Sequence, residues 1–136
     1  MEALTTRIET LCRNDLHIVT LHRPTHREFF VTAKGRPFSE LAAWLRAEDA
    51  RVLSMEILGI SYRDADIRRA FDDAFGPPSW PLLWSDDGCD TSTVLGGIQV
   101  WAVAGLPVKP LQHNGIVLGM LFEDDDLRMP RKAQLR

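Results

Sequence analysis

GIQVWAVA, residues 97–104, is the stretch that decides the fold. Successive side chains of an extended strand point to opposite sides of the sheet. One side of this stretch holds Ile98, Val100 and Ala102, and the other holds Gln99, Trp101 and Val103. A run that is apolar on both sides is typical of a strand buried on both faces of its sheet. We therefore expect a sheet in which this strand is covered from both directions.

The residues before this strand alternate between extended and helical patterns. Two extended runs, 16–21 and 28–32, flank a turn at Arg23-Pro24-Thr25 and predict a hairpin. Ser39 is expected to cap a short helix over 40–48, with Phe38 packed just before it. The stretch RVLSMEILG, residues 51–59, alternates again and predicts a strand.

A second helix has the clearest helical pattern in the chain. Its apolar face is formed by Ile67, Ala70, Phe71, Ala74 and Phe75. Asp64 or Ser61 can cap its first turn, and Gly76 suits the left-handed position that ends a helix. Two prolines follow and forbid continuation. The next segment, WPLLW at residues 80–84, predicts a short extended stretch.

The two ends of the chain are expected to differ from its centre. Asn114-Gly115 lies between 111–113 and 116–122, and this pair predicts a type I′ hairpin turn. We therefore expect an N-terminal extension at 1–15, one domain at 16–122 that includes the hairpin 111–122, and a loose charged tail at 123–136.

Together these elements predict an α+β fold of order ββαβαβ with a C-terminal hairpin. Two helices can cover only one face of the sheet. The face that carries Trp101 then needs another cover, and for a domain of this size we expect a second copy of the chain.

Composition narrows the classes of function. The chain has 136 residues and a formal net charge of −3, which argues against a nucleic-acid-binding face. No apolar run reaches the ~20 residues that a membrane span needs. Two cysteines, Cys12 and Cys89, are too few for a disulfide framework and favour a reducing, cytoplasmic setting. We expect no nucleic-acid partner, no membrane association and no cofactor.

Several strings in this order resemble the RidA (YjgF, endoribonuclease L-PSP-like) family. They are RVLSMEILG at 51–59, IRRAFDDAFG at 67–76, the proline-containing break at 77–81 and GGIQVWAVAG at 96–105. The resemblance covers about residues 16–105. It implies a chorismate-mutase-like sheet, three copies of which pack into a central barrel. It also implies clefts between subunits in which active members hydrolyse reactive imines.

The chain departs from that family at the two residues that the reaction needs most. The resemblance implies an arginine just after the prolines, to hold the substrate carboxylate, but WPLLW contains none. It also implies an acid on the last core strand, where this chain has Gln99, an amide that cannot act as a base. We therefore expect a homotrimer that binds a small apolar or aromatic metabolite and lacks standard imine deaminase activity. The expected ligand-binding residues are Trp80, Leu83, Trp84, Gln99 and Trp101.

Two alternatives stay open at this point. The first is an enzyme that acts on an imine or an enol-type, chorismate-like substrate through other groups, with Cys89, Asp90 and Glu56 as catalytic candidates. The second is a structural module in which the C-terminal hairpin serves as an interface.

No metal site is expected. His22 and His26 are four residues apart, but Pro24 lies between them and removes the helical geometry that would make them a ligand pair. We expect both to be solvated histidines of a turn.

Overall fold

The chain forms two β-sheets and two helices, and the computed structural model describes residues 6–59, 63–85, 96–124 and 129–134. The elements are β1 (Arg7–Arg13), β2 (Leu16–His22), β3 (Arg27–Lys34), α1 (Phe38–Ala47), β4 (Arg51–Leu58), α2 (Ala65–Phe75), β5 (Leu82–Ser85), β6 (Gly97–Ala104), β7 (Val108–His113), β8 (Ile116–Asp124) and β9 (Met129–Gln134). The large sheet has the order β1-β2-β3-β6-β4-β5, and the small sheet has the order β7-β8-β9. Among the described strands only β4 and β5 pair in parallel, so the large sheet is mixed, and the fold is α+β as predicted.

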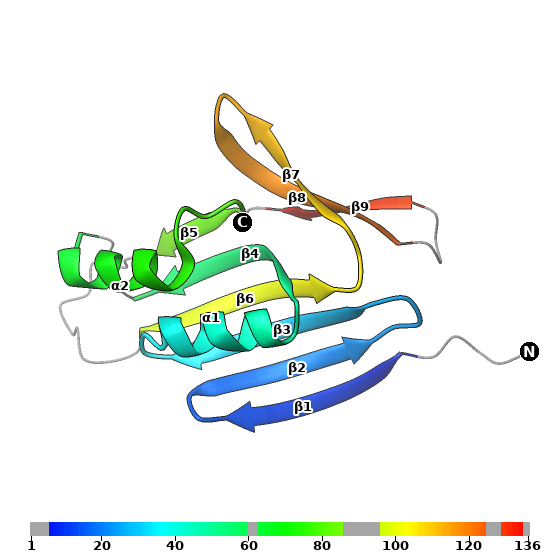
Figure 1. The fold of residues 1–136 in the computed structure, drawn as a ribbon, viewed down its shortest axis with the longest axis horizontal. Coiled ribbons are helices and arrows are strands. Elements are labelled where there is room, and N and C mark those ends of the chain that lie inside the picture. Colours follow the sequence, from blue (N-terminus) through cyan, green and yellow to red (C-terminus); the bar gives the residue numbers. More distant parts are fainter. Residues whose placement is uncertain (1–5, 60–62, 86–95, 125–128, 135–136) are drawn as a thin grey trace, which may run out of the picture.

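Strand β6 lies inside the large sheet, between β3 and β4. Val100 is opposite Val31 on β3 and Met55 on β4, and all three are buried. Both helices lie on this side of the sheet (Figure 1). Their buried residues, which include Leu41 and Phe71, form one continuous core with these strands. No helix in the described ranges is long and apolar enough to cross a membrane.

Local sequence signals fix the ends of α2 and the tip of the β7–β8 hairpin. The Asp64 carboxylate accepts hydrogen bonds from the backbone N–H groups of Asp66 and Ile67, at 2.9 and 3.2 Å, which confirms the predicted cap. Ser61, the other predicted cap, lies outside the described residues. Asn114 and Gly115 have φ of 52° and 79°, the two positive values that a type I′ turn requires.

The predicted start of the first helix is wrong. Helix α1 begins at Phe38, follows Pro37 and has no side-chain cap from Ser39. Phe38 is buried instead, with its ring centroid 5.6 Å from Phe71 and 6.4 Å from Phe75. Apolar contact with α2 therefore sets the beginning of α1, because burying a phenylalanine is worth more than a single cap hydrogen bond.

Both ends of the chain contain strands that the sequence pattern did not predict. Strand β1 pairs with β2 along its whole length, and β9, in the tail expected to be loose, pairs with β8. All seven residues of β1 are exposed. An exposed edge strand needs backbone hydrogen bonds but no buried side, so it lacks the apolar alternation by which strands are recognised.

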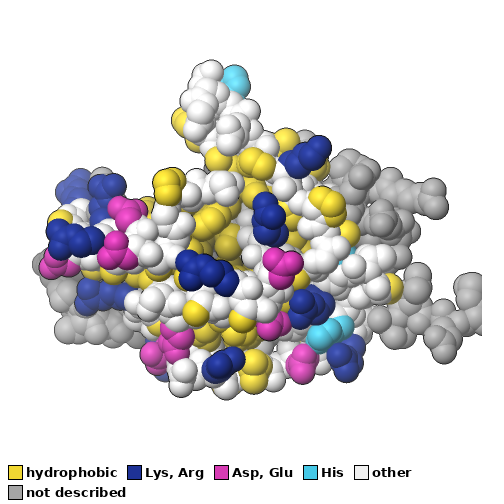
Figure 2. Space-filling model, viewed as in Figure 1, with side chains coloured by type: hydrophobic (Ala, Val, Ile, Leu, Met, Phe, Trp, Pro, Cys, Tyr) yellow, Lys and Arg dark blue, Asp and Glu magenta, His cyan; other side chains and the backbone are white. Residues whose placement is uncertain are grey.

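The side of the large sheet away from the helices is partly covered by the small sheet. Val108, Met120 and Phe122 of the small sheet are buried against Leu53 and Val103 of the large one. A bulge between Val52 and Ser54 allows Val52 to join the helix-side core while Leu53 joins this second core. The prediction that this side needs a second copy to cover it is therefore wrong at the Val103 end. Hydrophobic side chains gather in the angle between the large sheet and the hairpin (Figure 2).

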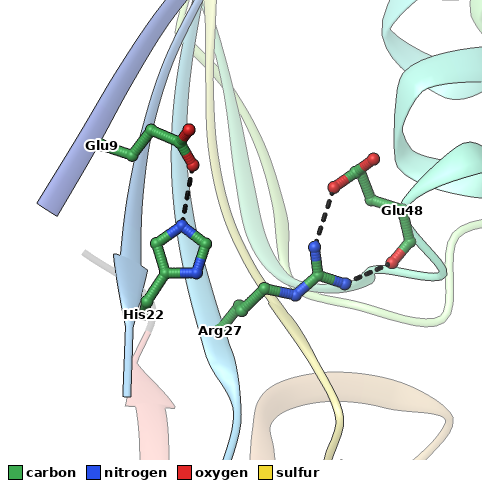
Figure 3. A network of polar contacts seen from close by, with 4 residues as sticks. All are labelled: Glu9, His22, Arg27 and Glu48. Carbon is green, nitrogen blue, oxygen red and sulfur yellow. Dashed lines mark hydrogen bonds and ion pairs between the residues drawn. The ribbon is translucent and has the colours of Figure 1, made fainter. Parts of the chain in front are cut away.

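Two pairs of polar residues join neighbouring elements, one within the large sheet and one between the sheet and the end of α1 (Figure 3). His22 Nε2 lies 2.7 Å from Glu9 Oε1 and links β2 to β1. Arg27 donates to the carboxylate of Glu48 at 2.9 Å and to its backbone oxygen at 3.3 Å, which ties β3 to the end of α1. The hydrogen bond from His22 holds the pKa of the Glu9 carboxyl below its usual value.

Replacing Phe122 tests whether the two sheets unfold together. We expect Phe122→Ala to lower the free energy of unfolding by about 3–5 kcal/mol, because it removes a buried ring from the only core that joins the sheets among the described residues. Denaturant unfolding followed by circular dichroism should keep a single transition. The control is Leu118→Ala on the same strand, which is 50% exposed and should change stability by less than about 0.5 kcal/mol. Equal effects of the two variants would contradict this packing.

Candidate functional site

The part of the sheet face that the small sheet leaves open carries a row of four side chains. Leu83 of β5 pairs with Glu56 of β4, Glu56 pairs with Gln99 of β6, and Gln99 pairs with Thr32 of β3. Directly opposite residues on adjacent strands bring their Cβ atoms to about 5 Å. The row therefore places an apolar side chain, a carboxylate, an amide and a hydroxyl next to one another.

The adjoining row contains two aromatic rings that stack on each other. Trp101 of β6 is opposite Ser54 of β4 and Phe30 of β3. The Phe30 and Trp101 ring centroids are 6.0 Å apart, and their planes differ by 11°. Phe30 is 41% exposed, whereas Trp101 is half-buried and packs against the core between the two sheets. The indole Nε1 of Trp101 is buried without a hydrogen-bond partner in the described structure.

We call these two rows the open patch. It consists of Phe30, Thr32, Ser54, Glu56, Leu83, Gln99 and Trp101. Its apolar centre can bind a planar ring by stacking, and its polar rim can donate or accept hydrogen bonds. Glu56 is the one group of the patch that can carry a charge, and a carboxylate can exchange a proton with a bound molecule.

The open patch ends at a buried polar cluster beneath the small sheet. Glu28 is on the same strand and face as Phe30, and it lies opposite Val103. Its carboxylate is 3.3 Å from Arg23 Nη2 and 3.6 Å from His26 Nε2. The side chains of His26 and Glu28 are 0% and 5% exposed.

His26 reaches this cluster because Gly105 allows a close approach of the chain. Gly105 has a φ of 98°, and a Cβ built on it would lie 3.3 Å from the backbone oxygen of Thr25. The His26 ring lies 6.3 Å from the ring of Phe122. Its Nδ1 is 3.0 Å from the Thr25 hydroxyl, and its Nε2 has no hydrogen bond. The cluster therefore holds ionisable groups at the place where the two sheets meet.

The structure brings together four of the residues predicted from the sequence. Leu83, Glu56, Gln99 and Trp101 all belong to the open patch. Their common face follows from the pairing of β5, β4 and β6, which the sequence pattern did not include.

Other predicted site residues lie elsewhere. Trp84 packs on the helix side of the sheet, with its ring centroid 5.7 Å from that of Phe71. Trp80 packs against Phe75 at 5.9 Å and borders both cores. Neither aromatic ring is part of the open patch, because Trp84 is on the opposite face of β5 from Leu83 and Trp80 lies before the strand begins. The catalytic candidates Cys89 and Asp90 lie outside the described residues.

Sequence reasoning missed Phe30 and the buried cluster. The signal was present in EFFVT at 28–32, where strand alternation places Glu28, Phe30 and Thr32 on one face. Choosing that face required the pairing of β3 with β6. The prediction that His26 is solvated is wrong, since the small sheet covers it.

Metal ligands do not gather anywhere in the described residues, since no group of three His, Cys, Asp or Glu side chains is close enough to hold an ion there. His22 contacts Glu9, whereas His26 contacts Glu28. The two histidines therefore serve separate contacts.

No family model matches this chain, and no curated protein or solved structure is significantly similar to it.

Removing the Glu28 carboxylate tests the buried cluster. We expect Glu28→Ala to lower the free energy of unfolding by about 3 kcal/mol, because Arg23 and His26 lose the only carboxylate near them in the described structure. Glu56→Ala is the control, since Glu56 is half-buried on the same face and makes no ion pair among the described residues. Urea unfolding at pH 7 measures both. A cost for Glu28→Ala no larger than that for Glu56→Ala would contradict an energetically coupled cluster.

Proposed function

We propose that this chain is a RidA-like protein that forms a homotrimer and binds a small apolar or aromatic metabolite at the open patch, without standard imine deaminase activity. The element order and the placement of both helices on one side of the sheet support the RidA-like assignment. The exposed, unpaired thiol of Cys12 supports a reducing, cytoplasmic setting.

The observation that carries this proposal is the exposed aromatic pair. Phe30 leaves 41% of its surface in water although it is stacked on Trp101 in the middle of a sheet face. Covering exposed apolar area contributes roughly 25 cal/mol per Å², and aromatic stacking adds about 0.5–1.5 kcal/mol. A planar ligand, or the edge of a neighbouring subunit, would be stabilised at this position by both the burial of apolar area and the stacking.

The charge of the open patch argues against the carboxylate ligand of an imine deaminase. None of its seven residues is positively charged, and Glu56 would repel an anion. A charge-assisted hydrogen bond contributes about 1.5–3 kcal/mol. Without an arginine in WPLLW, an amino-acid-derived substrate loses that stabilisation, whereas a neutral aromatic molecule loses nothing.

Assembly and binding are tested together. We expect light scattering to give a mass of three chains of 15.4 kDa, or of six where two trimers associate, and ligand-observed NMR with indole and phenol as probes to show binding. Phe30→Ala should weaken probe binding about tenfold, because it removes one stacking surface of about 1.4 kcal/mol. Leu118→Ala, at an exposed position on β8, is the matched control and should bind normally.

Two results would overturn the proposal. A mass of one chain would contradict the trimer. Equal binding of the probes to wild type and Phe30→Ala would contradict binding at the open patch.

One observation favours an enzyme as the second candidate function. Glu56 is directly opposite Gln99, so a carboxylate lies one strand away from the position where the RidA resemblance implies an acid. In this alternative, Glu56 takes a proton from water as the oxygen attacks the carbon of a C=N bond, and it returns that proton to the nitrogen as the π bond breaks. Collapse of the resulting carbinolamine then expels ammonia and leaves a carbonyl product. An enol ether would differ in its first step, because its β-carbon must accept a proton from the acid form of Glu56 before water adds to the oxocarbenium carbon and the hemiketal expels an alcohol.

The enzymatic alternative predicts a rate that depends on Glu56. With a freshly generated 2-aminoacrylate-type imine, Glu56→Gln should lower kcat/KM by about 10²–10⁴-fold, the usual contribution of a general base. Glu40→Gln in the first turn of α1, on the other side of the sheet, should keep the wild-type rate. No rate above buffer for the wild-type chain would remove this alternative and leave the binding function standing.

A further inference from the structure

Strand β1 forms an open edge of the large sheet. It pairs with β2 on one side and is the last strand in the sheet order, so its other side has no strand partner in the described structure. The pairing with β2 runs over all seven residues without a bulge, and the strand contains no proline. Natural proteins usually shorten, bend or cover such an edge, because its free N–H and C=O groups recruit another strand.

Strand β1 carries exposed apolar side chains as well as charged ones, which is typical of an interface. Leu11 is 46% exposed and Ile8 is 68% exposed. Arg7, Glu9, Leu11 and Arg13 alternate along the strand and therefore share one face. Along this face the side chains are positive, negative, apolar and positive. This order of charges restricts how a second copy of β1 can pair with the strand.

Antiparallel pairing of two identical strands about a two-fold axis allows three registers that pair at least five residues of β1 with each other, and they are centred on Glu9, Thr10 and Leu11. Each register places one residue opposite its own copy, and neighbours are then paired symmetrically around it. A register centred on Thr10 places Arg7 opposite Arg13 twice. A register centred on Glu9 places two glutamates opposite each other. Like charges in directly opposite positions are unfavourable.

The register centred on Leu11 is complementary. It places the two Leu11 side chains opposite each other and pairs Glu9 with the Arg13 of the other copy twice. It also brings Arg7 next to Asp15, in the turn after β1. Arg13 makes no ion pair within the described part of its own chain.

Glu9 is available for that pairing in its ionised form. Its side chain is 60% exposed although one oxygen contacts His22, so its second oxygen can accept from an arginine. A glutamate is ionised at neutral pH, and the contact with His22 lowers the pKa of this carboxyl further.

We propose that β1 is a self-association edge, at which two copies of the chain pair antiparallel in the register centred on Leu11. The six strands of each copy then form one continuous sheet across a two-fold axis. This surface lies at the opposite edge of the sheet from β5 and shares no residue with the open patch. The pairing therefore does not depend on the proposed ligand, and together with a trimer it would join two trimers.

A charge exchange tests the pairing. Glu9→Arg places arginine opposite Arg13, and Arg13→Glu places glutamate opposite Glu9, so each should weaken two-fold association at least tenfold in concentration-dependent light scattering. The double variant, Glu9→Arg with Arg13→Glu, restores opposite charges and should return to within about threefold of wild type. His22→Ala controls for the lost contact to Glu9, and Arg68→Glu on α2 controls for the change in net charge. Both should associate as wild type does.

Cross-linking tests the register itself. In a chain with Cys12→Ser and Cys89→Ser, Leu11→Cys places two thiols directly opposite each other and should give a covalent dimer on mild oxidation. In the same background, Thr10→Cys places each thiol opposite residue 12 of the other copy. The two thiols are then not opposite each other, and no cross-link should form.

The outcomes separate this proposal from the proposed trimer. β1 pairing is supported if the single charge variants abolish twofold assembly and the double variant restores it. This holds whether or not a trimer forms. Assembly that is unaffected by all three variants overturns β1 pairing and leaves the trimer standing. Equal cross-linking of Leu11→Cys and Thr10→Cys, or a wild-type mass without any twofold multiple, also overturns it.

Discussion

The rest of the structure depends on the need to bury both sides of β6. Val100 and Ala102 on one side of this strand and Val103 on the other are almost completely removed from water. Each buried aliphatic side chain of this size contributes about 1.5–3 kcal/mol, so neither the helix side nor the Val103 end of the other side can stay exposed to water. The two helices cover one side. The small sheet covers one end of the other side, and its core also packs against Trp101 at the border of the open patch.

The extent of that cover defines the candidate site. The bulge in β4 turns Leu53 toward Met120 and Phe122, and the contact stops before it reaches Gln99. Phe30 therefore remains in solvent beside a half-buried Trp101. The ionisable cluster around Glu28 marks the border between the covered and open parts, where burying a charge requires a partner of opposite sign.

The two proposed surfaces use different parts of the same sheet. The open patch is a face, so it offers side chains to a ring or to a neighbouring subunit. Strand β1 is an edge, so it offers backbone hydrogen bonds and a charge pattern to another strand. A protein that used both would place its binding faces at fixed positions around a larger assembly, because pairing at an edge leaves the faces of the sheet accessible.

The sequence by itself determined the features that local chemistry controls. Asp64 caps α2, Gly76 ends it, Asn114-Gly115 turns the hairpin, and extended patterns located the core strands β2, β3, β4 and β6, because each signal acts within a few residues. Only the tertiary structure decided which apolar residues belong to the candidate site and which belong to the core. Leu83 is part of the open patch, whereas its neighbour Trp84 packs on the helix side. The edge strands β1 and β9, the start of α1 at Phe38 and the burial of His26 also depended on it. These outcomes follow from pairing between distant segments, and a residue's own neighbours in sequence carry no information about which strand will lie beside it or what will cover it.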